Sequence, residues 1–224
     1  MSAAGTTTLI LALVLALPFA PVRSHSADVL RTFEGETVGR APSGFVFRVA
    51  RESAPAHWVL QREGTNSFLA HLGEPSMRGG FSLAILETPL PAGATFVSAR
   101  TRRAGQDGSL GVVWRVQDAD NYYLAKLDLA RQDIGLYRVV RGNRVRIEGE
   151  DDLELDPNAW HTLKIVQEET DIRVYIGGIR VLRARDRTFA ASGAAGLWST
   201  GDAIAHFDDV RIGTEKDEDS RRGR

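Results

Sequence analysis

The chain has 224 residues, a formal net charge of −1 at pH 7 and no cysteine. The lack of cysteine excludes a disulfide-stapled secreted scaffold, a thiol nucleophile and a zinc knuckle. A nearly neutral chain also lacks the strong positive charge that is typical of nucleic-acid-binding domains, so we expect no nucleic-acid partner. The length is sufficient for one domain with a substantial apolar core.

The first segment has the features of an export signal. An apolar run from Leu9 to Leu17 ends at Pro18, and it is shorter than the roughly 20 apolar residues of a membrane-spanning helix. Ser24-His25-Ser26 then places small residues before Ala27, as a signal peptidase requires. We expect residues 1–26 to be a signal peptide, with a secreted, periplasmic or cell-surface product that has no membrane span after cleavage. A retained anchor or a misassigned start is the alternative.

The remaining sequence predicts one β domain over residues 27–213. Short strand-like runs follow one another at 58–60, 67–70, 82–86, 95–100, 111–116, 122–129, 135–140, 160–166, 172–176, 196–198 and 207–212. Turn-forming Gly, Pro, Asp and Asn separate them, and several runs alternate apolar with polar residues. This pattern predicts an all-β, two-sheet antiparallel sandwich. Residues 214–224 carry charge and no apolar side chain, so we expect a disordered tail.

Several short motifs in this domain resemble one family. They are Phe33-Glu34-Gly35, Gly39-x-x-Pro42-x-Gly44-Phe45, Asp118 to Tyr123, Trp160-His161-Thr162-Leu163, and Phe207 to Ile212. Together they resemble the concanavalin A-like lectin and glucanase jelly rolls, above all the laminin-G-like and 3-keto-disaccharide hydrolase-like domains of exported bacterial proteins. The resemblance implies two curved sheets, with ligands on the concave face or on its rim loops.

The same superfamily includes β-glucanases that carry Glu-x-Asp-x-Glu on one strand, where alternation places all three carboxylates on one face. The stretch 150–154 has this spacing, which makes Glu150, Asp152 and Glu154 the candidate catalytic residues. However, the polar Asp151 occupies a position that should be apolar, and the stretch lies only six residues before Trp160. We therefore interpret 148–154 as an acidic edge strand or loop. A glycoside or 3-keto-disaccharide hydrolase stays as an alternative function.

Basic residues recur at the strand positions opposite to the expected core positions. If Trp114, Leu163 and Val174 face the core, the alternate positions share the other face, and the candidate ligand-binding residues there are Arg115, Lys126, Arg138, Lys164 and Tyr175. The rings of Tyr175 and Tyr122 can pack against a sugar ring, Asn121 can bind its hydroxyls, and arginines can bind carboxylate or sulfate bidentately. We therefore expect an oligosaccharide or polysaccharide ligand, and the arginines favour an anionic one. A solvated sheet face without a ligand is the simpler interpretation, and a laminin-G-like protein-interaction module is a further alternative.

Asp208 is a candidate metal ligand. It shares the parity of Ile204, Val210 and Ile212, so alternation places it among core-facing residues unless a bulge intervenes. A buried carboxylate needs hydrogen bonds, a cation or a metal. Jelly rolls of this resemblance often hold a structural calcium between the first and last strands, which implies a site at Asp208 with backbone oxygens near Glu34. The alternative is that Asp208 or Asp209 accepts backbone N–H groups from the N-terminal loop. Apart from this candidate structural calcium, we expect no cofactor.

Overall fold

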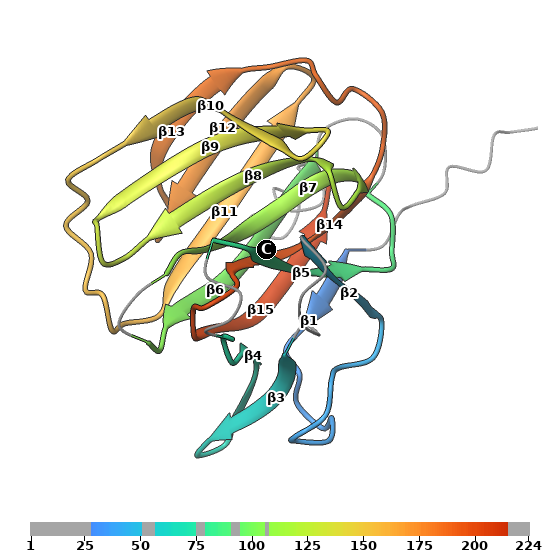
Figure 1. Cartoon of the computed structure of the whole chain (residues 1–224), viewed down its shortest axis with the longest axis vertical. Helices are drawn as coiled ribbons and strands as arrows, with labels where there is room; N and C mark the ends of the chain where they lie inside the picture. Colours follow the sequence, from blue (N-terminus) through green and yellow to red (C-terminus); the bar gives the residue numbers. More distant parts are fainter. Residues whose placement is uncertain (1–27, 51–56, 75–78, 91–94, 106–107, 215–224) are drawn as a thin grey trace, which may run out of the picture.

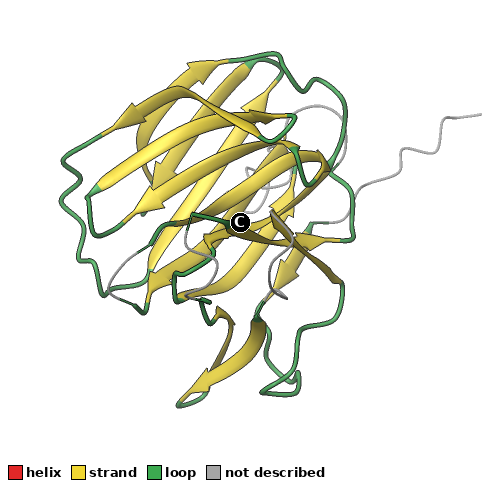
Figure 2. Cartoon of the chain, viewed as in Figure 1, coloured by secondary structure: helices red, strands yellow, loops and turns green. Residues whose placement is uncertain are grey.

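The computed structural model describes residues 28–50, 57–74, 79–90, 95–105 and 108–214. These residues form antiparallel strands joined by turns and loops (Figures 1 and 2). The expected signal peptide and nearly all of the expected tail lie outside the described residues. Within the described part of the chain there is no helix with the length and apolarity needed to cross a bilayer.

The strands form two sheets that pack face to face, as the sequence predicted (Figure 1). Sheet A has the order β13 (Ile179–Arg185), β12 (Asp171–Ile176), β11 (His161–Glu168), β6 (Thr95–Arg103), β15 (Ala205–Gly213), β4 (Asn66–His71) and β3 (Trp58–Glu63), and β1 (Val29–Arg31) pairs with β15. Sheet B has the order β10 (Asn143–Glu150), β9 (Asp133–Val140), β8 (Asn121–Asp128), β7 (Leu110–Asp118), β14 (Ala194–Thr200), β5 (Phe81–Leu86) and β2 (Phe45–Ala50).

Period-two alternation accounts for the core between the sheets. On β11 and β12, Leu163 lies opposite Ile176 and Ile165 lies opposite Val174, and all four side chains are buried in one apolar cluster. Trp114 of β7 belongs to the same cluster from the side of sheet B. The core positions predicted from alternation in these strands are therefore confirmed.

Four strands were not among the predicted strand runs: β1, β2, β13 and β10, although the end of β10 falls in the stretch 148–154 that was interpreted as an edge strand or loop. β2, β10 and β13 lie at the ends of their sheets, and β1 has a single partner strand, β15. Most residues of β10 are exposed, so its sequence has little apolar alternation to detect. Such strands are stabilised by backbone hydrogen bonds to one neighbour, which leave no signature in the side-chain pattern.

The indole N–H groups of two buried tryptophans, Trp114 and Trp58, are paired across the gap between the sheets. The indole Nε1–H of Trp114 donates to Oε1 of Gln167 on β11 over 2.7 Å. The indole of Trp58 on β3 donates to the hydroxyl of Ser82 on β5 over 2.6 Å. A buried N–H without a partner costs about 1–3 kcal/mol, so these bonds allow large rings to fill the core without that cost.

The Trp114–Gln167 bond can be tested through stability. Gln167→Ala leaves the Trp114 N–H without its acceptor in the core, so we expect the free energy of unfolding to fall by about 1–3 kcal/mol. Urea denaturation measures this change, with Gln61→Ala on the partly exposed side of β3 as the matched control. Equal losses in the two variants would contradict a special role for the inter-sheet bond.

Candidate functional site

The five predicted ligand-binding residues do not share one face, so this expectation was wrong. Arg115, Lys126 and Arg138 lie on β7, β8 and β9 of sheet B, whereas Lys164 and Tyr175 lie on β11 and β12 of sheet A. The outer faces of two stacked sheets point in opposite directions. Alternation assigns a side chain to the core or to the outside, but it does not say to which sheet a strand belongs.

Arg115 and Arg138 have structural partners. Arg115 occupies a bulged part of β7 with a φ of 51°, is 3% exposed, and donates to the carbonyl of Ala191; burial lowers the pKa of its guanidinium. Arg138 lies opposite the core-facing Tyr123 and donates to Asp186 over 2.6 Å. Both arginines therefore stabilise the sandwich from within or at its edge.

The remaining basic candidates lie on separate outer faces. Lys126 shares its parity with Tyr122 on β8 and projects from sheet B, where burial lowers the pKa of its ammonium group. Lys164 lies over the rings of Phe96 and Tyr175 on sheet A, 5.3 and 5.9 Å from their centroids. Ligand binding by these residues stays a prediction, and no single ligand site contains them all.

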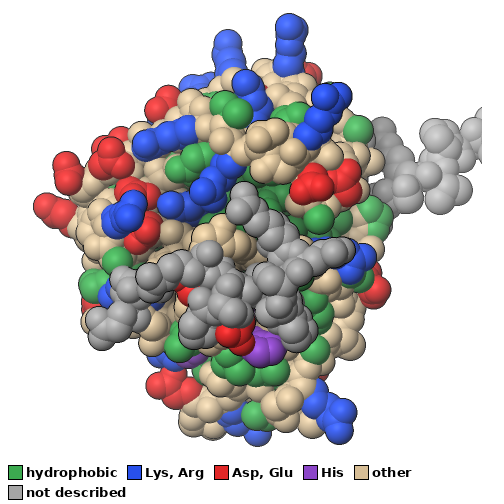
Figure 3. Space-filling view, viewed as in Figure 1, with side chains coloured by type: hydrophobic (Ala, Val, Ile, Leu, Met, Phe, Trp, Pro, Cys, Tyr) green, Lys and Arg blue, Asp and Glu red, His purple; other side chains and the backbone are tan. Residues whose placement is uncertain are grey.

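A different set of residues forms a pocket on the outer face of sheet B. We call it the sheet B pocket; its volume is about 350 Å³, and its side-chain lining is Phe81, Asp120, Tyr122, Val139, Arg144, Trp198 and Thr200. The chain contributes these residues from five strands and the β7–β8 turn. Figure 3 shows this side of the molecule, with Lys and Arg side chains gathered over the part of sheet B that contains β8–β10.

Aromatic rings line one wall of this pocket. Phe81 stacks on Trp198 with the ring centroids 5.9 Å apart, and it meets Tyr122 edge-on at 6.3 Å. The guanidinium of Arg144 lies 5.9 Å from the Trp198 ring and 5.4 Å from the ring of Tyr137. Burial raises the pKa of the Tyr122 hydroxyl, so that group stays neutral and can donate or accept a hydrogen bond.

Asp120 and Arg144 are the exposed charged groups of the pocket. The arrangement thus combines an apolar ring surface with a carboxylate acceptor and a guanidinium donor, whereas the hydroxyl of Thr200 bonds the backbone of Ser109. Such a combination suits a ligand that has both an apolar face and several hydroxyl groups.

Sequence reasoning named Tyr122 and Asn121 as sugar-binding elements but missed the other pocket residues. The structure uses Asn121 in the turn, where its side chain bonds Asp118 and the backbone of Arg141. A signal for Trp198 existed, because alternation in Gly196-Leu197-Trp198 places Leu197 in the core and Trp198 outside. Arg144 lies on an exposed edge strand whose sequence gave no apolar pattern.

The acidic stretch does not place its carboxylates on one strand face. β10 ends at Glu150, residues 151–155 belong to no strand, and Asp152 has a φ of 61°. Glu150, Asp152 and Glu154 are all exposed. The interpretation as an acidic edge strand or loop is confirmed, because β10 is the last strand of sheet B. Strand alternation therefore does not supply the carboxylate pair of a glycosidase.

A bulge in β15 changes the expected direction of Asp208. Ala205 and Phe207 face the core, the register shifts between Asp208 and Arg211, and Val210 and Ile212 face the core again. Asp209 has a φ of 46° at this bulge. The exception stated for a bulge therefore applies, and Asp208 does not share the core-facing side of Val210. Asp208 lies on the outer face of sheet A and is nevertheless only 2% exposed.

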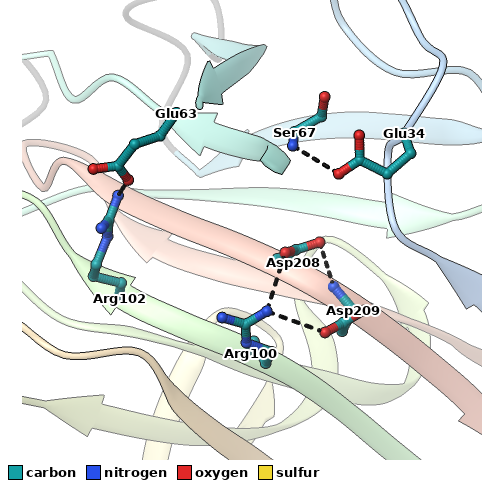
Figure 4. Close-up of polar contacts among 7 residues, drawn as sticks. All are labelled: Glu34, Glu63, Ser67, Arg100, Arg102, Asp208 and Asp209. Carbon is teal, nitrogen blue, oxygen red and sulfur yellow. Dashed lines mark hydrogen bonds and ion pairs between the residues drawn. The ribbon is translucent and has the colours of Figure 1, made fainter. Parts of the chain in front are cut away.

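Nearby donors stabilise the Asp208 carboxylate (Figure 4). Its Oδ1 accepts the backbone N–H of Asp209 over 2.7 Å, the side chain of Asn66 donates to it, and Arg100 lies 3.5 Å from its Oδ2. Burial still raises the pKa of Asp208. The N-terminal loop lies close by, since Glu34 accepts the N–H of Ser67 over 2.8 Å. Among the described residues no group of three or more His, Asp or Glu is arranged to hold a metal ion, and calcium at Asp208 stays a prediction.

The aromatic residues on the outer face of sheet A are covered by arginines. Arg102 lies 4.7 Å from the ring of Trp160 and 5.7 Å from that of Phe68, and Arg100 lies 5.1 Å from Trp160. Arg102 also donates to Glu63 over 2.6 Å, as Figure 4 shows, and lies 3.1 Å from Nδ1 of His206. These rings are therefore occupied by the protein's own cations.

The surroundings of His206 predict a pH dependence of stability. Burial, together with the charge of Arg102, lowers the pKa of His206 to about 4, whereas an unfolded histidine titrates near 6.5. The unfolded chain therefore binds the proton first as the pH falls from about 6.5 to 4. We expect this group to remove up to about 3 kcal/mol from the free energy of unfolding over that range.

Urea denaturation of the protein and of His206→Asn at pH 7, 5.5 and 4.5 measures this effect, and the variant should show a shallower fall. His57→Asn is the matched control, because His57 is exposed. A fall that is equally steep in all three proteins would exclude His206 as its source.

Asp208 and calcium can be separated experimentally. Asp208→Ala removes the acceptor for Asp209, Asn66 and Arg100, so we expect a loss of about 1–3 kcal/mol in the free energy of unfolding. Asp209→Asn, which tolerates a positive φ, should lose less. Because donors already surround the carboxylate, we expect EDTA to leave the melting temperature of the unmutated protein unchanged. A chelator-dependent decrease that Asp208→Ala lacks would instead demonstrate calcium.

Comparison with known proteins identifies the fold. No family model and no curated protein matches the sequence. Among solved structures, the carbohydrate-binding module CBM66 from Bacillus subtilis has a TM-score of 0.60 at 19% identity, over 76% of this chain and 96% of that one.

Two further structures agree. The carbohydrate recognition domain of Emp47p has a TM-score of 0.56 at 10% identity, over 84% of this chain and 94% of that one. A Bacillus licheniformis β-glucanase has a TM-score of 0.54 at 12% identity, over 84% and 98%. The resemblance inferred from the short motifs is thus confirmed at the level of fold: the described residues have the two-sheet jelly-roll fold of these structures.

Proposed function

We propose that this protein is an exported carbohydrate-binding module that binds a glycan in the sheet B pocket. The observation that carries the proposal is the joint presence of ring surfaces and exposed polar groups in that pocket. A pyranose ring has apolar C–H faces and a rim of hydroxyl groups. Phe81 is partly exposed and offers the apolar surface, while Tyr122 and Trp198 support it from behind and are each only 1% exposed. Asp120 and Arg144 offer hydrogen-bond partners for the hydroxyls.

An arginine lies over an aromatic ring on both outer faces, since Arg144 is 5.9 Å from the centroid of Trp198 in the sheet B pocket. The outer face of sheet A differs in that its arginines are held by ion pairs. Its aromatic residues Trp160 and Phe68 already have Arg100 and Arg102 over their rings. A sugar there would have to displace a guanidinium that also bonds Glu63. The pocket of sheet B has a volume of about 350 Å³, within the roughly 300–1,000 Å³ that is typical of small-molecule sites.

The structural neighbours point in the same direction. Two of them are named for carbohydrate binding or recognition, and the fold is shared over most of each chain. The inference of export depends on the apolar run Leu9–Leu17 and the small residues before Ala27. Hydrolysis receives less support, because the grouped carboxylates of the sequence do not share a strand face.

Affinity electrophoresis through gels that contain neutral or anionic polysaccharides tests the function, followed by staining of the same gels for cleared zones. Retarded migration without clearing is the expected result. Cleared zones would favour the hydrolase, and the acidic stretch at Glu150 would then be the first target for substitution. Free migration in every gel would exclude both carbohydrate functions and favour a laminin-G-like protein partner.

Arg144 provides the test of the pocket itself. Arg144→Ala removes an exposed donor beside Trp198, so folding should be unaffected and the affinity for the retained glycan should fall by about tenfold, equivalent to one lost charge-assisted hydrogen bond of about 1.4 kcal/mol. Isothermal titration calorimetry measures the change. Arg180→Ala, an exposed arginine on β13 of sheet A, is the matched control and should bind as the unmutated protein does. Unchanged affinity in Arg144→Ala would place the glycan elsewhere.

A further inference from the structure

A second pocket lies at the edge of the sandwich. We call it the rim pocket; its volume is about 740 Å³, and it is lined by Arg138, Thr170, Arg185, Asp186, Arg187 and Thr188. It forms where β9, the turn after β11 and the end of β13 meet. Three arginines and one carboxylate give its lining a positive balance.

The one carboxylate of the rim pocket is fully engaged. Oδ1 of Asp186 accepts the hydroxyl of Tyr123 over 2.6 Å and the N–H of Thr188 over 2.7 Å, and Oδ2 accepts Arg138 over 2.6 Å. Burial by itself would raise the pKa of Asp186, but these donors hold it at about 2. Asp186 is therefore ionised at neutral pH, and its charge is compensated by Arg138.

Arg185 and Arg187 flank Asp186 in the sequence and are both exposed. The neighbouring acid Asp171 compensates Arg185 only in part, because Arg173 and Arg183 also attract it and lie 3.3 and 2.8 Å from its oxygens. The rim pocket thus keeps positive charge, and the side chain of Arg138 is still 39% exposed. Arginine forks are well suited to carboxylate and sulfate, which they bind bidentately.

We propose that the rim pocket binds the carboxylate or sulfate group of an acidic saccharide, with Arg185 and Arg187 as the main anion-binding residues. Arg138 also lines the rim pocket, but its guanidinium donates to Asp186, so it contributes a positive charge at a fixed position. The identification of the ligand as a saccharide rests on the proposed function. The two pockets lie on opposite sides of β9, since Arg138 lines the rim pocket and the next residue, Val139, lines the sheet B pocket. Substitutions can therefore separate them.

The test uses pairs of polymers that differ in charge. Dextran sulfate is compared with dextran, and tetragalacturonate with its methyl ester, by isothermal titration calorimetry on the full chain. The double variant Arg185→Ala/Arg187→Ala should bind at least one of the anionic ligands about tenfold or more weakly, and its affinity for neutral ligands should be unchanged. Both arginines are exposed, so the variant should fold normally, which its melting temperature verifies.

A second double variant controls for net charge. Arg131→Ala/Arg180→Ala removes the same charge from exposed positions outside the pocket, and it should bind as the unmutated protein does. An equal loss in both double variants would overturn the proposal, because the attraction would then be a general charge effect. Equal affinity of the unmutated protein for each charged ligand and its neutral counterpart would overturn it as well.

Further outcomes separate the two proposals and the two anions. If anionic binding depends on Arg185 and Arg187 while Arg144→Ala changes nothing, the rim pocket is supported and the glycan site in the sheet B pocket is refuted. If Arg144→Ala weakens the binding of neutral ligands and the Arg185→Ala/Arg187→Ala variant affects no ligand, the glycan site in the sheet B pocket is supported and the rim pocket is refuted. Preference for dextran sulfate or for tetragalacturonate identifies sulfate or carboxylate as the bound group. Binding of inorganic phosphate without binding of any saccharide would overturn the saccharide assignment.

Discussion

The structure depends on the pairing of polar atoms of large aromatic side chains across the gap between two sheets. Trp114, Trp58 and Tyr123 each fill core volume, and each directs its one polar hydrogen to a partner supplied by the opposite side of the sandwich. Without those partners the buried N–H and O–H groups would each cost free energy. The bonds also specify which strands face one another, which an apolar core by itself constrains less closely.

The outer faces of the two packed sheets carry different arrangements of aromatic and charged side chains. On sheet A the exposed side of the aromatic residues is covered by Arg100 and Arg102, whose charges are balanced by Glu63, Asp208 and Asp209. On sheet B the rings of Phe81, Tyr122 and Trp198 line a pocket with Arg144 at its side. The same residue types therefore give a layer of ion-paired arginines on one face and a pocket with an exposed arginine on the other.

The charges of the chain are distributed in a comparable way. The net charge of −1 conceals a local excess of arginine at the rim, since Asp186 and Asp171 are already paired with other arginines. The bond from Tyr123 to Asp186 joins this rim to the core. Asp186, which bonds Tyr123 of the core, thus also holds Arg138 and leaves Arg185 and Arg187 exposed at the edge. This arrangement links the fold to the second proposed site.

The sequence by itself determined the all-β sandwich and its main core positions, because alternation such as that of Leu163 and Ile165 is a local property of each strand. It did not determine the edge strand β10, which is held by backbone bonds to β9 and has mostly exposed side chains. Nor did it determine the direction of Asp208, because one bulge residue reverses the parity. Only the tertiary structure decided that Arg115 and Lys164 belong to different sheets, and that Trp198, Tyr122 and Arg144 meet in one pocket. Which strands become neighbours depends on long-range pairing, and no local pattern of side chains records it.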